Sequence, residues 1–187
     1  MGRSGIRLTY EDYCAIPADG KRHEILDGEE YVSPAPSTLH QAIVGRLLRM
    51  LGGWCEASKS GIVLAAPCDV ILSAEDVAQP DLLFIAKDHV DIVKDHGIEG
   101  APDLAIEILS GSTRRLDEVV KRKRYEKFGV SEYWISDLET HSAEIYRRSG
   151  GGFAPAIEVA PEGAVESPLF PGLRVPLMPL FADPRRH

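Results

Sequence analysis

The stretch Asp103–Leu109 restricts the possible fold more than any other part of the chain. It is a short apolar run with β-branched residues, and a proline before it and a glycine after it limit its length. These features predict a strand rather than a helix. Alternate residues of a strand face opposite sides, so one face would carry Leu104, Ile106 and Ile108, and the other Ala105, Glu107 and Leu109. Apolar residues on both faces indicate a central strand covered on both sides.

Glu107 is the exception within this strand, since a carboxylate stands where an apolar residue would be more stable. A buried carboxylate without a partner is strongly unfavourable, so Glu107 should be protonated, paired or bound to a cation. The alternative is a glutamate near the end of the strand that reaches solvent. The strand alone does not distinguish between these two interpretations.

A second carboxylate stands at the start of another apolar run, Gln79–Ala86. Asp81 follows Pro80, which cannot donate a hydrogen bond to a neighbouring strand. If the two runs form neighbouring strands, Asp81 and Glu107 can come together. Paired carboxylates with free positions for water are the ligands that Mg²⁺ or Mn²⁺ requires. The pair therefore predicts a divalent-cation site, which neither residue would predict alone.

Length and charge limit the classes of protein that the chain can belong to. Its 187 residues are enough for one domain with a sizeable core, and we expect a single domain over residues 1–187. The formal net charge of −8 argues against a protein that coats nucleic acid through bulk charge. A local basic surface remains open, because one short segment carries Arg114, Arg115, Lys121, Arg122, Lys123, Arg124 and Lys127.

The sequence also predicts a cytoplasmic location. No apolar stretch approaches the length that spans a membrane, and the first residues lack the apolar segment of a secretory signal. Cys14, Cys55 and Cys68 are odd in number and lack paired metal-ligand spacing. We therefore expect neither a disulfide framework nor a zinc site, which fits a reducing compartment.

Two features near the N-terminus have clear local signatures. Thr9 is suited to cap a short helix, and Asp27-Gly28 predicts a hairpin between Arg22–Leu26 and Glu29–Val32. The hairpin carries a third acid, Glu24, which on its own would be a solvated residue of an edge strand.

Two longer helices are predicted from apolar residues at three- and four-residue spacing. The first covers Leu39 to Cys55. The second follows the Glu107 strand, begins with a cap at Ser112 or Thr113 and ends at Gly129. Its buried side is expected to carry Leu116, Val119, Val120 and Phe128.

The order of these elements predicts an α/β fold. We expect a mixed sheet flanked by the two long helices, with the N-terminal hairpin at one end and an outer C-terminal hairpin around Gly150–Gly152. The charged segment Lys87–Gly100 is expected to be a surface loop with at most one helical turn. Leu169–Val175 is expected to be a tail that packs back on the domain.

A lysine beside the two acids would complete a site for phosphodiester cleavage. Lys121 is the candidate, because four-residue spacing places it on one helix face with Asp117 and Tyr125. A divalent cation activates water and neutralises phosphate charge, and a lysine adds electrostatic stabilisation. Glu24 would complete the cation shell or accept a proton. The alternative is a solvated basic helix face whose side chains cover apolar surface.

Other residues are candidates for contact with the ion or with the substrate. Ile108, next to Glu107, is a candidate metal ligand. The candidate substrate-binding residues are His40, Arg114, Arg115 and Tyr125. His40 stands on the first turn of the first long helix, where it could form hydrogen bonds, face a phosphate or be simply exposed.

Several separated motifs resemble one known family. They are Arg22–Glu29, Pro34–His40, Pro80-Asp81, Pro102–Ser110, the series Asp117, Lys121 and Tyr125, and Gly129–Ile135. Together they resemble the Uma-type endonucleases of the PD-(D/E)xK, restriction-endonuclease-like superfamily. The resemblance runs from about Leu8 to Phe181 in the same order.

The resemblance implies a mixed sheet flanked by helices, with a Mg²⁺-dependent nuclease site. By position, Asp81 is the aspartate of the superfamily, Glu107 is its second acid, and Glu24 matches an early acid of the family. The superfamily lysine is expected two residues after Glu107, where this chain has Leu109. A lysine from the following helix substitutes for it in this family, which points to Lys121. Gly111 stands where the family often has proline.

Three functional hypotheses follow. The first is a Mg²⁺-dependent endonuclease acting on DNA, with Mn²⁺ as a possible substitute. The second is a catalytically silent module that binds nucleic acid or protein, favoured by the absent lysine at Leu109 and by the negative net charge. The third is a metal-dependent phosphoesterase acting on RNA or nucleotides. A homodimer is expected by analogy with enzymes that cut both strands.

Overall fold

The computed structural model describes residues 7–111 and 113–185. Its main sheet has seven strands in the order β12-β11-β10-β9-β6-β3, with β13 also paired to β11. These strands are β3 (Gly61–Ala65), β6 (Leu82–Ala86), β9 (Leu104–Leu109), β10 (Glu132–Asp137), β11 (Ser142–Ser149), β12 (Gly152–Phe153) and β13 (Ile157–Val159). β9 pairs in parallel with β10 and antiparallel with β6. The predicted mixed sheet, the central strand and the outer C-terminal hairpin are therefore confirmed.

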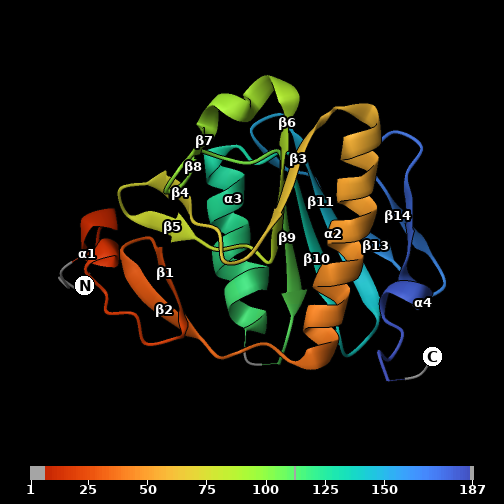
Figure 1. The fold of residues 1–187 in the computed structure, drawn as a ribbon, viewed down its shortest axis with the longest axis horizontal. Helices are drawn as coiled ribbons and strands as arrows, with labels where there is room; N and C mark the ends of the chain where they lie inside the picture. The colour runs from red at the N-terminus through yellow and green to blue at the C-terminus, as the bar shows by residue number, and fades with distance from the viewer. Residues whose placement is uncertain (1–6, 112, 186–187) are drawn as a thin grey trace.

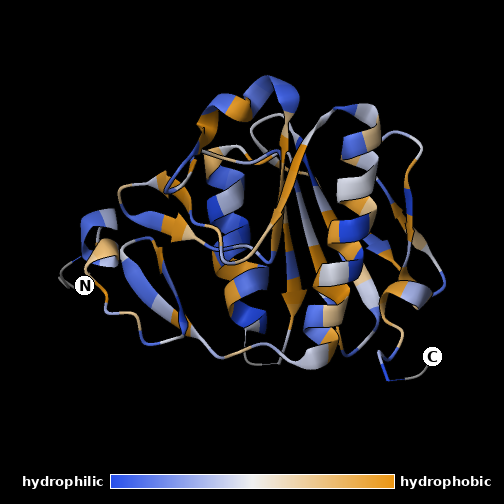
Figure 2. Ribbon diagram, viewed as in Figure 1, coloured by the Kyte–Doolittle hydropathy of each residue, from blue (hydrophilic) through white to orange (hydrophobic). Residues whose placement is uncertain are grey.

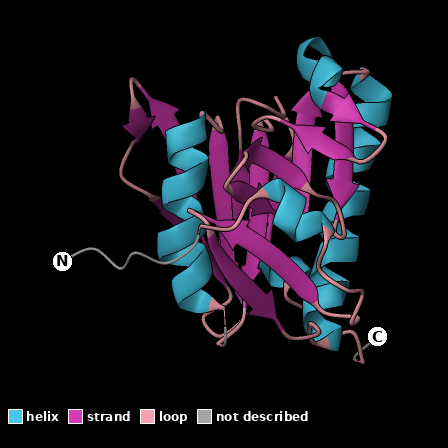
Figure 3. Ribbon diagram, turned by 90° about the vertical axis from the view of Figure 1, so that its left-hand side faces the viewer, coloured by secondary structure: helices cyan, strands magenta, loops and turns pink. Residues whose placement is uncertain are grey.

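Helices cover both faces of this sheet, as Figure 3 shows. On one side lies α2 (Thr38–Ser58), and on the other the crossover from β9 to β10, formed by η2 (Leu116–Lys121) and α3 (Arg122–Phe128). The predicted first long helix is capped by Ser37, whose side chain accepts the N–H of His40.

The two faces of β9 belong to different apolar clusters. Leu104, Ile106 and Ile108 pack in the cluster that contains α2, whereas Ala105 and Leu109 pack with residues of the α3 side. The alternation predicted from the sequence is confirmed, and the central strands are largely hydrophobic (Figure 2). Glu107 consequently points toward α3 from a strand buried along its whole length.

The N-terminal part forms a second sheet that the sequence did not indicate. Its order is β2-β1-β5-β4-β8-β7. These strands are β1 (Arg22–Leu26), β2 (Glu29–Ser33), β4 (Val70–Ser73), β5 (Asp76–Ala78), β7 (Val93–Lys94) and β8 (Gly97–Glu99). The hairpin at Asp27-Gly28 is confirmed, and so is the short helix α1 (Tyr10–Cys14), which Thr9 caps. The N-terminal elements lie on the left of Figure 1.

The expectation of a surface segment with one helical turn over Lys87–Gly100 is confirmed in part, and only its two short strands were missed. This segment contains a 3₁₀ helix, η1 (Lys87–Ile92), followed by β7 and β8. The two strands have only two or three residues each, which is too short for an alternating pattern to be visible.

The second long helix is confirmed, and its buried face agrees in part with the expected one, since Leu116 and Val120 pack against the core. Val119 is 37% exposed, whereas Asp117, Lys121 and Tyr125 are among the deepest side chains of the protein. Polar residues therefore also line the inner face. Gly129 ends the helix with φ of 95°, a left-handed conformation that glycine adopts readily. Ser112, one of the two predicted cap residues, lies outside the described residues.

The C-terminal segment packs back on the domain, as expected. β14 (Ala164–Glu166) pairs with β15 (Arg174–Pro176), and α4 (Leu177–Leu180) follows. Phe170 and Val175 are buried in the cluster that includes α2. Within the described ranges, no helix has both the length and the apolar character needed to cross a membrane.

Candidate active site

Asp81 and Glu107 are brought together by the pairing of β6 with β9. These strands are antiparallel, with Leu82 opposite Ile106. One further step of the same register places Asp81 opposite Glu107. β6 begins at Leu82, so Asp81 stands just before the strand. Here its side chain, rather than its backbone, accepts the N–H of Ile108, through Oδ2 at 2.8 Å. The two runs are thus neighbouring strands, as expected.

Lys121 approaches the acids from the helical segment after β9. Its Nζ lies 2.9 Å from Oε1 of Glu107, 2.9 Å from Oε1 of Glu24 and 3.4 Å from Oδ1 of Asp117. Asp117 and Lys121 belong to η2, which is a π-helix, a conformation found frequently at functional sites. All four side chains are almost completely buried. One ammonium group therefore holds three carboxylates together beside β9. Figure 1 shows α3, which continues η2, next to β9.

Glu24 joins this cluster from the second sheet. Its Oε1 accepts the N–H of Gln79 at 2.7 Å, and Gln79 follows β5, the strand that pairs with β1. Its other oxygen, Oε2, is buried and has no hydrogen-bond partner among the described residues. The expectation of a solvated edge residue is wrong for Glu24, because strands on both sides of β1 bury its side chain completely.

Asp81 is held by two side chains in addition to the backbone. Its Oδ2 is 3.0 Å from Nε2 of His40, and its Oδ1 accepts a hydrogen bond from Arg22 at 2.8 Å. His40 is buried, so the interpretation of an exposed residue at the helix start is wrong and its role in hydrogen bonding is the observed one. Nδ1 of His40 has no partner among the described residues.

Burial and charge shift the pKa values of this cluster in opposite directions. Burial would raise the pKa of Asp81, but the bonds from His40 and the charge of Arg22 lower it to about 2. Burial raises the pKa of Glu107 well above its ordinary value, although Lys121 opposes the shift. Burial would lower the pKa of Lys121, but Glu107, Glu24 and Asp117 raise it well above the ordinary value. The three acids thus favour the ammonium form of Lys121.

Asp81, Glu107 and Asp117 face a small cavity of about 200 Å³, whereas Glu24 lies behind Lys121 and does not line it. The lining of the cavity includes Asp81, Glu107, Ile108, Asp117 and Lys121, and the connector between β2 and α2 forms another part of the wall. The predicted metal ligands and the predicted lysine thus border one space.

The residues of this cavity fit a divalent cation. The available donors are oxygens, which Mg²⁺ prefers. The acidic side chains outnumber the basic ones, since Glu24, Asp81, Glu107 and Asp117 contact Arg22 and Lys121. Oε2 of Glu24 is a further buried oxygen without a hydrogen-bond partner among the described residues, although Glu24 does not line the cavity itself.

A bound ion would keep positions for water. No group of three His, Cys, Asp or Glu side chains in the described part of the chain is already placed to hold a metal. Asp81 and Glu107 would be the side-chain ligands. Ile108 could offer only its carbonyl, because its side chain is in the apolar core and its N–H binds Asp81. Mg²⁺ usually retains several waters, so two carboxylates suit it.

The candidate substrate contacts are only partly placed at the cavity. His40 lines it, whereas Arg114 and Arg115 are not part of its wall. Arg114 is bound to Glu118 and Asp137, both at 2.9 Å. Tyr125, the fourth candidate, does not line this cavity either.

Tyr125 has no exposed surface. Its hydroxyl donates to Oε1 of Glu107 at 3.2 Å. Tyr125 therefore orients the acid instead of meeting a ligand.

Two residues of the site were missed as candidates from the sequence, Arg22 and the acid Asp117. Arg22 stands two residues before Glu24 on the same strand, so alternation could have placed both side chains on one face. Asp117 precedes Lys121 by four residues, and this spacing already indicated a pair.

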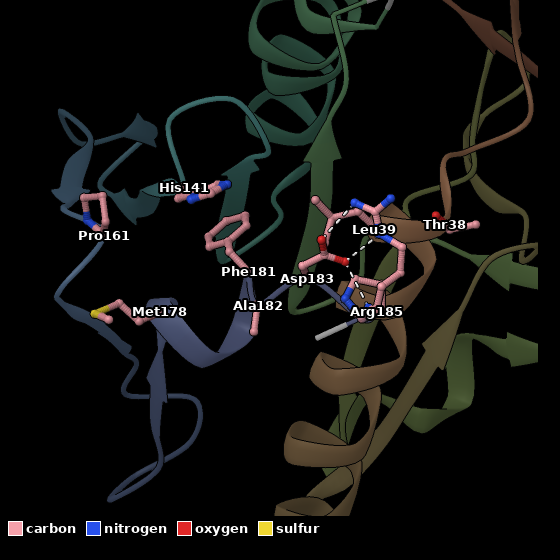
Figure 4. Close-up of a pocket in the computed structure, with 10 residues that line it drawn as sticks. Thr38, Leu39, His141, Pro161, Met178, Phe181, Ala182, Asp183 and Arg185 are labelled. Carbon is pink, nitrogen blue, oxygen red and sulfur yellow. Dashed lines mark hydrogen bonds and ion pairs between the residues drawn. The ribbon is translucent and has the colours of Figure 1, made fainter. Parts of the chain in front are cut away.

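A larger cavity, of about 750 Å³, lies elsewhere (Figure 4). It is bordered by the start of α2, by α4 and by the residues after α4, including Phe181. His141 stacks on Phe181 there, with 5.2 Å between ring centroids. The charged side chains that Figure 4 draws, Asp183 and Arg185, form an ion pair with each other. None of the clustered acids reaches this cavity, so its size does not indicate the site of the chemistry.

The fold and the acid–lysine cluster define a restriction-endonuclease-like α/β protein. The family Uma2, described as "Putative restriction endonuclease", matches residues 10–178. The chain therefore belongs to the Uma2 family, and the resemblance seen in the sequence is confirmed.

The fold is shared with a protein of known crystal structure, described as "a putative nuclease belonging to DUF820", from Anabaena variabilis. The two structures superpose with a TM-score of 0.79 over 93% of this chain and 97% of the other. Their sequences are 18% identical, so this likeness concerns the fold alone. A search among curated proteins found no match.

Proposed function

We propose that this chain is a Mg²⁺-dependent endonuclease that hydrolyses phosphodiester bonds in DNA, with Mn²⁺ as an alternative ion. Membership of the Uma2 family supports nuclease activity. The observation that carries the proposal is the position of Lys121, whose Nζ lies 2.9 Å from Oε1 of Glu107 at the cavity that Asp81 also lines. Two acids from paired strands and an ammonium group from the crossover helix are the parts that phosphodiester hydrolysis needs.

Asp81 and Glu107 would hold the ion. When bound, Mg²⁺ supplies Lewis acidity and neutralises negative charge on the phosphate oxygens. Asp81 is suited to this role because its low pKa keeps it ionised at neutral pH. Tyr125 fixes the direction of Glu107 through its hydroxyl, and Ile108 fixes the direction of Asp81 through its N–H.

Lys121 would act as a fixed positive charge. The neighbouring acids raise the pKa of Lys121 and favour its ammonium form, which suits it to electrostatic stabilisation rather than to accepting a proton. An ammonium group that faces the cavity stabilises negative charge developing on phosphate oxygens. Glu24 and Asp117 hold this group in place from two further sides.

Cleavage assays on purified protein test the proposal. Labelled DNA and RNA substrates are incubated with Mg²⁺, with Mn²⁺ or with a chelator. We expect wild-type cleavage of DNA that the chelator abolishes. Asp81→Asn and Glu107→Gln should lower the rate at least about a hundredfold, since even changes beyond the direct ligands lower metal affinity or activity 10–100-fold.

Glu166→Gln is a matched control, because Glu166 is an exposed acid in β14. It should cleave at the wild-type rate, and circular dichroism should show that all three variants remain folded. Equal cleavage by the wild type and by both site variants would refute the proposal. Cleavage of RNA alone would correct the substrate to RNA. If the folded wild type neither cleaves nor binds metal in calorimetry, the interaction module becomes the better description.

A further inference from the structure

Arg22 is the most accessible positive charge at the candidate active site. Its side chain is 21% exposed, compared with 7% for His40 and 2% for Lys121. It extends from β1, and its guanidinium donates to the carbonyl of Gln79 at 3.3 Å and to Oδ1 of Asp81 at 2.8 Å. Both contacts are made by the terminal nitrogens of Arg22, whose side chain stays partly open to solvent.

The contact with Asp81 involves the oxygen that an incoming ion would use. Oδ2 of Asp81 already accepts the N–H of Ile108 and contacts His40. Oδ1 is bound by Arg22. Burial would lower the pKa of Arg22, but the charges of Asp81 and Glu107 raise it above its ordinary value, so the guanidinium lies within the field of both acids. The guanidinium group therefore lies where the negative charge of the acids would also favour a divalent cation.

Arg22 also stands where two cavities meet. It lines the 200 Å³ cavity with Glu107 and Lys121, and a second cavity of about 420 Å³ on the side of Gln41 and Pro67. Asp81 and His40 line both as well. The scissile phosphate would lie in the 200 Å³ cavity, next to Lys121. A guanidinium group released from Asp81 would therefore remain beside it.

We infer that Arg22 alternates between two partners: it neutralises Asp81 in the free protein and binds a phosphate group of DNA once a divalent cation is bound beside Asp81. This inference rests on the proposed function. Repulsion between the ion and the guanidinium weakens the contact of Arg22 with Asp81. A planar guanidinium can then bind two phosphate oxygens at once, which a lysine cannot.

Two binding measurements on the full chain test the inference. Calorimetric titration with MgCl₂ or MnCl₂ alone measures ion affinity. Fluorescence anisotropy of a labelled DNA duplex with cleavage-resistant phosphorothioate linkages measures DNA affinity, with the ion and with a chelator. Arg22→Gln should bind the ion roughly threefold more tightly or better, because no charge-assisted hydrogen bond has to be displaced.

The same variant should bind DNA about tenfold more weakly than the wild type with the ion present, the effect expected from the loss of a hydrogen bond to a charged group. With the chelator the two proteins should bind DNA with equal affinity, because Arg22 of the wild type is then bound to Asp81 and cannot contact a phosphate. Arg174→Gln removes an exposed arginine on β15 and should change neither affinity appreciably. Thermal unfolding verifies that each variant is folded.

If Arg22→Gln does not fold, Arg22→Lys replaces it. This variant keeps the charge beside Asp81, so its ion affinity should equal that of the wild type, while its DNA affinity with the ion should fall severalfold. Weaker ion binding by Arg22→Gln, or unchanged DNA binding by either variant with the ion, would overturn the inference while leaving the proposed function intact. A wild-type protein that binds neither ion nor DNA would overturn both.

Discussion

Replacing Lys121 by methionine would remove the ammonium group that three buried carboxylates share. Methionine has a similar length and no charge, so the variant changes the electrostatics more than the packing. Glu24, Glu107 and Asp117 would keep their places on β1, β9 and η2. The perturbation therefore tests whether the cluster depends on this one charge.

The structure sets the expected magnitude. Nζ of Lys121 lies 2.9, 2.9 and 3.4 Å from the nearest oxygens of the three acids, and its side chain is 2% exposed, so solvent screens these contacts little. Removing one partner of a buried ion pair typically destabilises a protein by about 3–5 kcal/mol, since the other charge stays buried without compensation. We expect a loss of this size at about pH 8.

The loss should depend on pH with a defined sign. Lys121 lowers the pKa values of Glu107 and Asp117, so its removal raises both further above their values in the unfolded chain. A group whose pKa is raised by folding contributes stability that is present below its unfolded pKa and lost as pH rises through its folded pKa. The variant should therefore recover much of the lost stability on acidification to about pH 5.

Urea unfolding followed by circular dichroism at several pH values measures this effect. Lys123→Met is the control, because Lys123 is exposed and lies only two residues after Lys121, on another side of the same helical segment. It should change the free energy of unfolding by no more than about 0.5 kcal/mol. A loss in Lys121→Met below about 1 kcal/mol, or one that is equal at both ends of the pH range, would refute the reasoning.

Two further predictions concern the neighbours of this cluster. Tyr125→Phe removes the hydroxyl that donates to Glu107 and should lower stability by about 1–2 kcal/mol in urea unfolding, whereas an unchanged midpoint would contradict the assigned contact. Folding lowers the pKa of Asp81 from 3.8 to about 2, which corresponds to a contribution of about 2 kcal/mol. This contribution is present above the pKa of the unfolded chain and is lost as pH falls through the pKa of the folded protein. Asp81→Asn should therefore be less stable than the wild type at about pH 6 and nearly equal to it at about pH 2. A difference in the free energy of unfolding that stays constant with pH would exclude this explanation.

The parts of the fold that could be predicted from the sequence are those specified by local patterns. Alternation in Asp103–Leu109 was sufficient for the central strand, and Asp27-Gly28 was sufficient for the hairpin. The second sheet could not be predicted, because β5, β7 and β8 are short and partly polar. Such strands form because of their partners, and their own sequence contains little evidence of them.

The site was predictable to the extent that its members follow a spacing rule. Two acids at strand positions and a lysine on a defined helix face were found from the pattern, and the structure places them at one cavity. The burial of Glu24 and His40 was not predictable, because it depends on neighbours distant in sequence, namely β5 and Asp81. The inner face of η2 is partly polar for the same reason: the carboxylate of Glu107 requires a cation, and this requirement outweighs the usual preference for apolar contacts.

The position of the lysine shows how one chemical requirement can be met from a different element. The superfamily pattern expects a lysine two residues after Glu107, on the same strand and face, and Leu109 stands there. Leu109 packs in the apolar cluster beneath α3, so a charged side chain at this position would have to be buried among apolar groups. Lys121 instead reaches Glu107 from η2, the helix that packs on this face of the sheet. Asp117 contacts the same ammonium group from one turn earlier in η2, and Glu24 contacts it from β1. The ammonium group is then fixed by three acids from three elements, so its position depends on the tertiary structure as a whole rather than on the strand that carries Glu107.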